Sequence, residues 1–340
     1  HGHAQGPIGS LLIREAGHPV PDQDTFSATE EALALTDGLT AEDTVLFLLS
    51  GGGSALFEAP LVPQEELQSI TQSLLASGAD IVEMNTIRKR LSAVKGGRFA
   101  QHCAPAKVFS IVLSDIIGDP LDMIASGPAY PDSSTCADAR RIAEQYGLRL
   151  SPEASQCLER ETPKVLDNVE TLITGSVREL CAAASAACRE LGYEPVLLTD
   201  SLDCEAREAG AFLAAVARAH QDTERSLAFL AGGETVVHLT GSGLGGRNQE
   251  LALSAAAGIA GLEDTAVFSL GSDGTDGPTD AAGGFVDGGT KERLARQGVR
   301  IFEVLKNNDA YHALAACGGL LHTGATGTNV NDVAVLLIRR

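Results

Sequence analysis

The chain has 340 residues, 44% of them hydrophobic, which is enough for two folded domains of ordinary size. Its formal net charge of −20 and its lack of tryptophan argue against a nucleic-acid partner, because such partners require clustered Lys and Arg and often aromatic stacking platforms. The sequence contains neither an apolar run of about 18 residues nor a signal peptide, so we expect a cytoplasmic protein without a membrane partner.

Short apolar runs alternate with amphipathic stretches along the chain, a pattern typical of α/β layers. The apolar runs predict strands buried on both faces, as in parallel sheets: Val45–Leu49, Val108–Leu113, Thr171–Ile173, Pro195–Leu198, Leu227–Leu230, Ala266–Leu270 and Val333–Ile338. The amphipathic stretches predict helices: Thr25–Thr36, Glu65–Ala76, Val177–Leu191, Glu205–His220 and Gln249–Ile259.

A polar stretch at residues 221–226 predicts a boundary between a larger domain, residues 1–222, and a smaller one, residues 223–340. The seven cysteines are odd in number, and no two have the C-x-x-C spacing of a zinc or redox site. We therefore expect reduced thiols, most of them buried.

Four predicted strands run directly into glycine-rich turns, and open α/β sheets bind ligands beyond the carboxyl ends of their strands. The first turn is formed by Ser50, Gly51, Gly52, Gly53 and Ser54. Its backbone N–H groups can form a nest for phosphate or carboxylate, although a plain tight turn explains the same residues. The Walker A pattern is absent.

Residues 83–98 place five cations within eleven residues of an acidic chain. In a helix, Arg88, Lys89 and Lys95 can crowd toward one face. We expect Arg88, Lys95 and Arg98, with the nearby Asn85, to bind anionic groups. The alternative is a solvated charged face.

Carboxylates occur at two further strand ends. Asp115 follows a strand directly and can hold Mg²⁺ or orient a hydroxyl group, unless it caps the next segment. Asp273 and Asp276 lie in a Gly/Thr-rich loop that could supply carboxylates to Mg²⁺, although the loop lacks the EF-hand frame.

A glycine loop at residues 241–246 leads into an apolar helix. Gly245, Gly246, Arg247 and Asn248 would face an anion there, because free N–H groups and the positive helix end add to the arginine charge. The alternative is a capped helix whose Arg247 pairs with a surface carboxylate. For Asn308, ligand contact and loop support both remain open. His18 and His238 are expected to be structural.

These segments, taken in order, resemble one family: the class II glycerate kinases, whose C-terminal part is the MOFRL domain. The resemblance rests on the motifs EAGHPVPD, SGGGSA, EMNTIRKRLSAVKGGR, LSDIIGD, ASGP, TGS, GGET, GGRNQELAL, SDGTDGPTDAAG, NNDAYH and TGTNVNDVAVLL. They cover nearly the whole chain.

The resemblance implies transfer of the γ-phosphoryl group of ATP to the 2-hydroxyl of D-glycerate with Mg²⁺, giving 2-phosphoglycerate and ADP. It also implies a Rossmann-like three-layer domain and a second, smaller α/β domain, with the active site in the cleft between them. The family's arginine in GGRN falls on Arg247. Family chains usually begin with a further α/β segment bearing a glycine–lysine turn, which implies that this chain is short at its N-terminus.

In this hypothesis the Ser50–Ser54 nest and the loop with Lys95 and Arg98 hold anionic groups of the substrate or nucleotide, and Arg247 stabilises the transferring phosphoryl group. Asp273 or Asp115 holds Mg²⁺, and one of the two accepts the hydroxyl proton. Two alternatives stay open. Some family members carry the label hydroxypyruvate reductase, which would need NAD(P)H, but no clean dinucleotide fingerprint is present. A truncated chain could also bind ligand without turnover. A monomer and a homodimer are both open.

Overall fold

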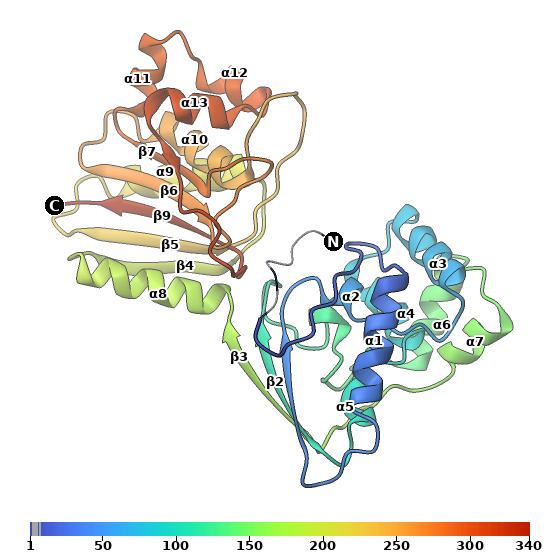
Figure 1. Ribbon diagram of the computed structural model, residues 1–340. Coiled ribbons are helices and arrows are strands. Elements are labelled where there is room, and N and C mark those ends of the chain that lie inside the picture. The colour runs from blue at the N-terminus through green and yellow to red at the C-terminus, as the bar shows by residue number, and fades with distance from the viewer. Residues whose placement is uncertain (2–5, 7) are drawn as a thin grey trace. The chain divides into compact units, whose positions relative to one another are not determined.

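The computed structural model describes residues 1, 6 and 8–340, and it divides the chain into two compact units (Figure 1). The first unit comprises residues 1–113 and 119–174, and the second comprises residues 114–118 and 175–340. Each unit combines helices with its own sheet, so the α/β class and the two-part organisation are confirmed. No helix in the described part of the chain is long and apolar enough to cross a membrane.

The first unit contains a three-stranded sheet in the order β1-β2-β3, in which β1 and β2 are parallel. Its strands are β1 (Thr44–Leu49), β2 (Lys107–Leu113) and β3 (Val169–Gly175). Its helices are α1 (Gln23–Leu35), α2 (Gly53–Leu56), α3 (Gln64–Ala76), α4 (Ile81–Arg90), α5 (Arg98–His102), α6 (Cys136–Gln145) and α7 (Pro152–Leu158), with a 3₁₀ turn at Ile124–Ser126. Because this sheet has only three strands, the Rossmann-like description stays a prediction.

One face of this sheet packs on an aromatic cluster formed by Phe47, Phe57 and Phe99, with ring centroids 4.9–5.7 Å apart. The opposite face exposes the large side chains of Leu46 and Leu48. Strand β1 is therefore apolar on both faces, a pattern typical of a strand that is covered on both sides. Within this unit, however, only one of its two faces is covered.

The second unit contains a six-stranded sheet in the order β4-β5-β9-β6-β7-β8. Its strands are β4 (Glu194–Leu202), β5 (Leu227–Gly233), β6 (Thr265–Gly271), β7 (Gly283–Asp287), β8 (Leu320–Leu321) and β9 (Asp332–Ile338). Its helices are α8 (Val177–Glu190), α9 (Ala206–Ala219), α10 (Arg247–Gly258), α11 (Thr290–Arg296), α12 (Ile301–Lys306) and α13 (Ala310–Cys317). Helix α8 covers one face of the sheet, and α9 and α10 cover the other (Figure 1).

Helices α9 and α10 approach one another closely because small residues face each other. A Cβ atom at Gly210 would lie 2.2 Å from the carbonyl oxygen of Leu251, so a side chain there would force the helices apart. This close packing fixes the direction of α10, whose first residue is Arg247.

All seven predicted strands and all five predicted helices are present. The central strand β9 runs antiparallel to both β5 and β6, which differs from the expected parallel arrangement. A strand buried on both faces is apolar in either direction, so its sequence does not specify its orientation.

The boundary expected between residues 222 and 223 falls inside the second unit, between α9 and β5. Strands β4 and β5 pair in parallel across this point, so one sheet continues through it. All seven cysteines are free, and five are buried, as expected.

Candidate functional site

The glycine loop after β1 is held in a strained, closely packed geometry. Gly52 has a φ of +83°, and a Cβ atom at Gly53 would lie only 2.6 Å from the Cβ of Ala125. Ala125 itself has a φ of +50°. Among the described residues, none accepts a hydrogen bond from the N–H groups of Gly51, Gly52 or Gly53. The loop therefore keeps the free donors that an anion-binding nest requires.

Two other predicted segments meet beside this loop. The Oγ atoms of Ser54 and Ser126 are 3.3 Å apart, and Ser126 donates a hydrogen bond of 2.8 Å to Oδ1 of Asn85. The ASGP turn thus links the glycine loop to helix α4. Asn85 is buried, and its carbonyl oxygen is engaged by Ser126.

The basic run does not present one face, which corrects the expectation that Arg88 and Lys89 crowd together. Lys89 is buried and pairs with Asp132 at 3.1 Å and Asp122 at 3.2 Å. Successive residues of a helix point about 100° apart, so Arg88 is directed elsewhere. Arg98 donates from Nη1 to the carbonyl groups of Lys89, Arg90 and Ser92, and this contact caps the end of α4.

Lys95 is fully buried. Its Nζ lies 3.0 Å from the carbonyl oxygen of Phe57, 3.4 Å from that of Ala125 and 3.7 Å from Oε2 of Glu58. Burial lowers the pKa of Lys95 and raises the pKa of Glu58. Lys95 is thus engaged by the protein itself. Glu58 was not predicted, because a single acid in the segment LFEAP gives no signal of its own.

Arg88 lies at the wall of a cavity of about 370 Å³ in the first unit. Within the described part of the chain, no residue forms a hydrogen bond or an ion pair with its guanidinium. Burial lowers the pKa of Arg88, and the charge of Glu58 partly opposes this effect. Arg88 therefore lies with its positive charge at the cavity wall, and its expected anion-binding role stays a prediction.

In the second unit, the carboxyl ends of β5 and β6 flank the amino end of β9. Asp332, the first residue of β9, pairs with Gly233 on one side and Gly271 on the other. Arg247 lies here and donates from Nε and Nη2 to the two carboxylate oxygens of Asp332, at 2.5 and 3.1 Å. Its Nη1 is 2.8 Å from Oε1 of Glu234.

These carboxylates stabilise the positive charge of Arg247. Burial alone would lower its pKa, but the hydrogen bonds and charge of Asp332, together with the charge of Glu234, raise it above the ordinary value. Asp332 and Glu234 were not assigned roles from the sequence. The available signal was their position, since each lies at the end of a strand.

Asn331 connects this cluster to Asp115. Its Nδ2 donates to Oε2 of Glu234 at 3.2 Å and to the carbonyl oxygen of Asp115 at 3.0 Å. The carboxylate of Asp115 has no hydrogen-bond or ion-pair partner among the described residues and is partly exposed. In Asp273, Oδ1 accepts from the N–H of Thr275 at 2.9 Å.

The start of α10 is occupied from within the protein, in contrast to the expected free N–H groups. Asp276 accepts hydrogen bonds from the backbone N–H groups of Asn248 at 3.1 Å and Gln249 at 2.8 Å. A Cβ atom at Gly246 would lie 2.3 Å from Cγ of Asp276, so this glycine makes room for the carboxylate. Burial raises the pKa of Asp276 to about 6.

The predicted metal ligands do not form one cluster. In residues 1, 6 and 8–340, no group of three acidic or histidine ligand atoms within 4.8 Å includes Asp115, Asp273 or Asp276. Asp276 instead caps α10. Asn308 is also internal, since it accepts from the backbone of Thr240 and Gly241 and supports the loop that leads to Gly245.

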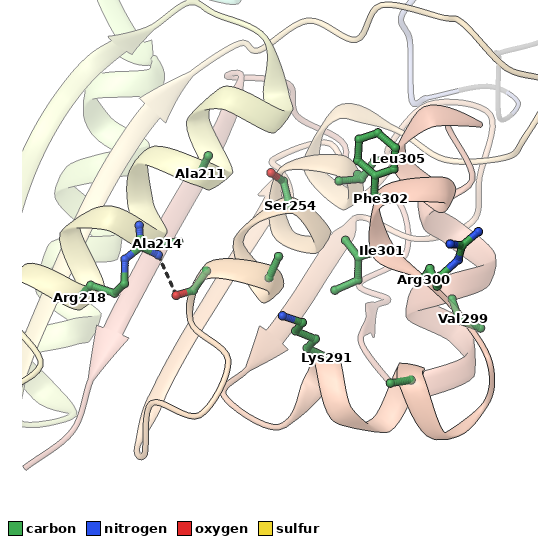
Figure 2. Close-up of a pocket in the computed structure, with 13 residues that line it drawn as sticks. Ala211, Ala214, Arg218, Ser254, Lys291, Val299, Arg300, Ile301, Phe302 and Leu305 are labelled. Carbon is green, nitrogen blue, oxygen red and sulfur yellow. Dashed lines mark hydrogen bonds between the residues drawn. The ribbon is translucent and has the colours of Figure 1, made fainter.

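A second cavity, of about 610 Å³, lies between α9, α10, α11 and α12 (Figure 2). Its walls are mostly apolar and include the cationic side chains of Arg218, Lys291 and Arg300. Arg218 is engaged, because its Nη1 donates to the carbonyl oxygen of Gly258 at 2.8 Å. None of the residues predicted from the sequence lines this cavity.

Two family models match the chain: "Domain of unknown function (DUF4147)" over residues 1–159 and "MOFRL family" over residues 227–332. The second match contains Glu234, Arg247 and Asp332. The chain is 54% identical to the D-glycerate 2-kinase of Thermotoga maritima, over 99% of this chain and 82% of that protein. It is 40% identical to the glycerate 2-kinase of Pyrococcus horikoshii, over 96% of this chain and 78% of that protein.

A crystal structure of the glycerate kinase from Thermotoga maritima is similar with a TM-score of 0.97 at 54% identity, covering 100% of this chain and 83% of that chain. The family expected from the motifs is thus confirmed in both sequence and fold. The chain belongs to the glycerate kinases of the MOFRL family.

Proposed function

We propose that the protein is an ATP-dependent D-glycerate 2-kinase that works in the cytoplasm. The observation that carries the proposal is the arginine at the start of α10, which is fixed by Asp332 and Glu234 at the ends of the central strands β9 and β5. It is supported by 54% identity to a protein named D-glycerate 2-kinase.

The proposed reaction makes one bond and breaks one. The 2-hydroxyl oxygen of D-glycerate forms a bond to the γ-phosphorus of ATP, and the bond from that phosphorus to the β,γ-bridging oxygen breaks. ADP leaves, and the hydroxyl proton passes to a carboxylate, for which Asp273 is our candidate. Such a transfer needs positioning and charge stabilisation more than covalent chemistry.

Arg247 is suited to stabilise the moving phosphoryl group. An arginine carries five N–H donors, and Arg247 donates two of them to Asp332. The ion pair with Glu234 fixes Nη1 as well, so the guanidinium is held before a phosphate arrives. About a third of the side chain is exposed, which leaves the remaining donors accessible.

The second unit contains carboxylate oxygens that suit Mg²⁺, because this ion prefers one or two carboxylates together with water and substrate phosphate. Asp115 has no partner among the described residues, and Asp273 uses one oxygen within its own loop. We propose that Asp115 holds Mg²⁺, whose charge would neutralise ATP phosphates, and that Asp273 is left to accept the hydroxyl proton. Asp276 is not part of this set, because its oxygens accept from α10.

In the first unit, we propose that the N–H groups of the Ser50–Ser54 loop meet anionic groups of the substrates. Lys95 and Arg98 direct their donors to protein carbonyl groups, which leaves Arg88 as the accessible cation. The resemblance implies that the residues of the first unit and those of the second unit act across one cleft. This arrangement stays a prediction.

The proposal is tested by replacing Arg247 with Ala and measuring ADP formation from ATP and D-glycerate. We expect a loss of about 10³-fold or more in kcat. Unchanged turnover would remove Arg247 from the mechanism. A parallel assay of hydroxypyruvate with NADH and with NADPH tests the reductase alternative, and nucleotide oxidation in place of ADP formation would overturn the kinase proposal.

A further inference from the structure

The cavity of about 370 Å³ in the first unit has a polar part and an apolar part. The segment around His18, together with α1, α3 and α4, contributes to its wall. Phe26, Leu67 and Met84 supply apolar surface, whereas Ser54 and Arg88 supply polar groups. The wall also carries the amides of Gln64, Gln68 and Gln72 and the hydroxyl of Thr71. A volume of a few hundred Å³ lined by apolar and polar groups is typical of a small-molecule site.

Two cations, Arg88 and Lys95, share one acid, Glu58, beside this cavity. Among the described residues that line it, Glu58 is the one acid, and Arg88 is the one residue with a permanent positive charge. Glu58 already faces Lys95, with 3.7 Å between Oε2 and Nζ. Burial lowers the pKa of Lys95 and raises the pKa of Glu58, and the two groups form either an ion pair or a neutral pair. The net charge of the pair is zero in either arrangement.

Glu58 thus acts on Lys95 as well as on Arg88, and no described residue forms a hydrogen bond or an ion pair with the guanidinium of Arg88. His18, the remaining titratable group at the wall, carries no negative charge in either form. A half-buried guanidinium without a partner is costly, since a buried charge normally requires a counter-charge. The chain as a whole has a net charge of −20, so an anion is attracted only by such a local excess of positive charge.

We propose that Arg88 binds the carboxylate of the acceptor, a short hydroxy acid, and that the hydroxyl oxygen of Ser54 at the same wall accepts a hydrogen bond from a hydroxyl group of the acceptor. This inference rests on the proposed function. It names Arg88 as the residue by which the kinase selects an acid as its acceptor. A planar guanidinium matches a carboxylate in a two-point geometry.

The charges of the two substrates favour the acceptor, and not the nucleotide, as the ligand of Arg88. One arginine balances the single negative charge of glycerate, whereas the triphosphate of ATP carries several charges and commonly requires Lys, Arg and Mg²⁺ together. The site is also larger than glycerate, which would occupy only its polar part.

The test compares Arg88→Gln with Arg88→Lys and with Arg149→Gln. Arg149 is an exposed arginine of the same unit for which no contact is found among the described residues, so it controls for loss of one positive charge. The substrates are D-glycerate and its methyl ester, which keeps the hydroxyl groups but lacks the charge. Calorimetric titration of D-glycerate and of propionate, without ATP, measures binding independently of activity. Thermal melting verifies that each variant is folded.

We expect Arg88→Gln to raise the KM for D-glycerate about 10- to 100-fold, in line with the loss of a hydrogen bond to a charged group, while the KM for ATP stays within about twofold. The preference for D-glycerate over its ester should largely disappear. Arg88→Lys should recover part of it, and Arg149→Gln should behave like the parent protein. D-Glycerate should bind more tightly than propionate, which lacks hydroxyl groups.

Three results would overturn parts of this account separately. If the parent protein phosphorylates D-glycerate and Arg88→Gln does so with an unchanged KM and ester preference, the inference is wrong and the kinase proposal stands. A rise in the KM for ATP instead would assign Arg88 to the nucleotide and also overturn the inference. If the parent protein shows no phosphorylation but binds D-glycerate in an Arg88-dependent way, the kinase proposal fails and the binding site stands.

Discussion

The guanidinium of Arg247 and the carboxylate of Asp332 form a two-point contact between the first residue of α10 and the first residue of β9. The two residues are 85 positions apart in the sequence. Asp332 is in turn paired with the last residues of β5 and β6, so it cannot move without disturbing the sheet. A rigid strand thereby fixes the orientation of a flexible side chain.

The first prediction concerns this contact. Asp332→Asn keeps the size of the side chain but removes its charge, so Arg247 should lose its fixed orientation. We expect kcat to fall about 100-fold, as for a displaced catalytic group, with the KM for D-glycerate changed little. Steady-state kinetics on Asp332→Asn, Arg247→Lys and the double variant provide the check. If the kcat of the double variant is much lower than that of the less active single variant, the two residues act independently, which would contradict the coupling.

Asp276 leads to a prediction about pH. Its pKa of about 6 in the folded protein exceeds its ordinary value of 3.8, so between these values folding takes up a proton. The stability from this group is fully present below pH 4 and is lost as pH rises through 6, by up to about 3 kcal/mol in total.

Asp276→Asn cannot titrate and should lack this dependence. Urea unfolding of both proteins at pH 4.5, 5.5 and 7 measures the effect. The free energy of unfolding of the parent protein, relative to that of the variant, should decrease from the lowest to the highest pH. A constant difference, or one of the opposite sign, would contradict the assigned pKa.

The strands and the longer helices could be predicted because burial leaves a local pattern in the sequence. Strand β7 was missed because its segment, Gly283–Asp287, begins with two glycines and has no apolar run. A close approach explains these residues, since a Cβ at Gly283 would lie 1.9 Å from the carbonyl oxygen of Ser269. Such a requirement comes from the partner strand and cannot be inferred from the segment alone.

The candidate site was predicted in part. Arg88 and Arg247 are candidates because clustered cations stand out in an acidic chain, and the glycine loop is one because it directly follows a strand; their roles stay predictions. The roles of Lys89 and Asp276 could not be inferred, because their partners, Asp132 and the start of α10, are distant in the sequence. Composition indicates that a charge is present, whereas only tertiary packing decides which groups the protein itself neutralises.

The third prediction separates structural from functional cations. Lys89→Met removes the partner of a buried carboxylate at Asp132, so we expect a loss of about 3 kcal/mol or more in the free energy of unfolding. Arg140→Gln, which breaks an exposed pair with Glu159, should cost less than about 1 kcal/mol. Urea denaturation compares them. Equal costs for the two variants would contradict the structural role of Lys89, as would a large rise in the KM for D-glycerate in a folded Lys89→Met protein.

The fourth prediction concerns the metal. If Asp115 contributes an oxygen to Mg²⁺, Asp115→Asn should raise the Mg²⁺ concentration needed for half-maximal rate about 10-fold or more, because a neutral amide is a weaker ligand for this hard cation. Asp276→Asn serves as the matched control, since Asp276 caps α10. The measurement is the rate of ADP formation against free Mg²⁺ at saturating ATP. A shift in the Asp276 variant with none in the Asp115 variant would reverse our assignment.

The position of phosphorylation tests the central claim most directly. The purified protein is incubated with ATP, Mg²⁺ and D-glycerate, and the product is followed by proton-coupled ³¹P NMR. Transfer to the 2-hydroxyl attaches phosphorus to a carbon that bears one hydrogen, so we predict a new phosphomonoester doublet that grows as ADP appears. A triplet, which indicates transfer to the 3-hydroxyl and its two neighbouring hydrogens, or inorganic phosphate alone would contradict the account.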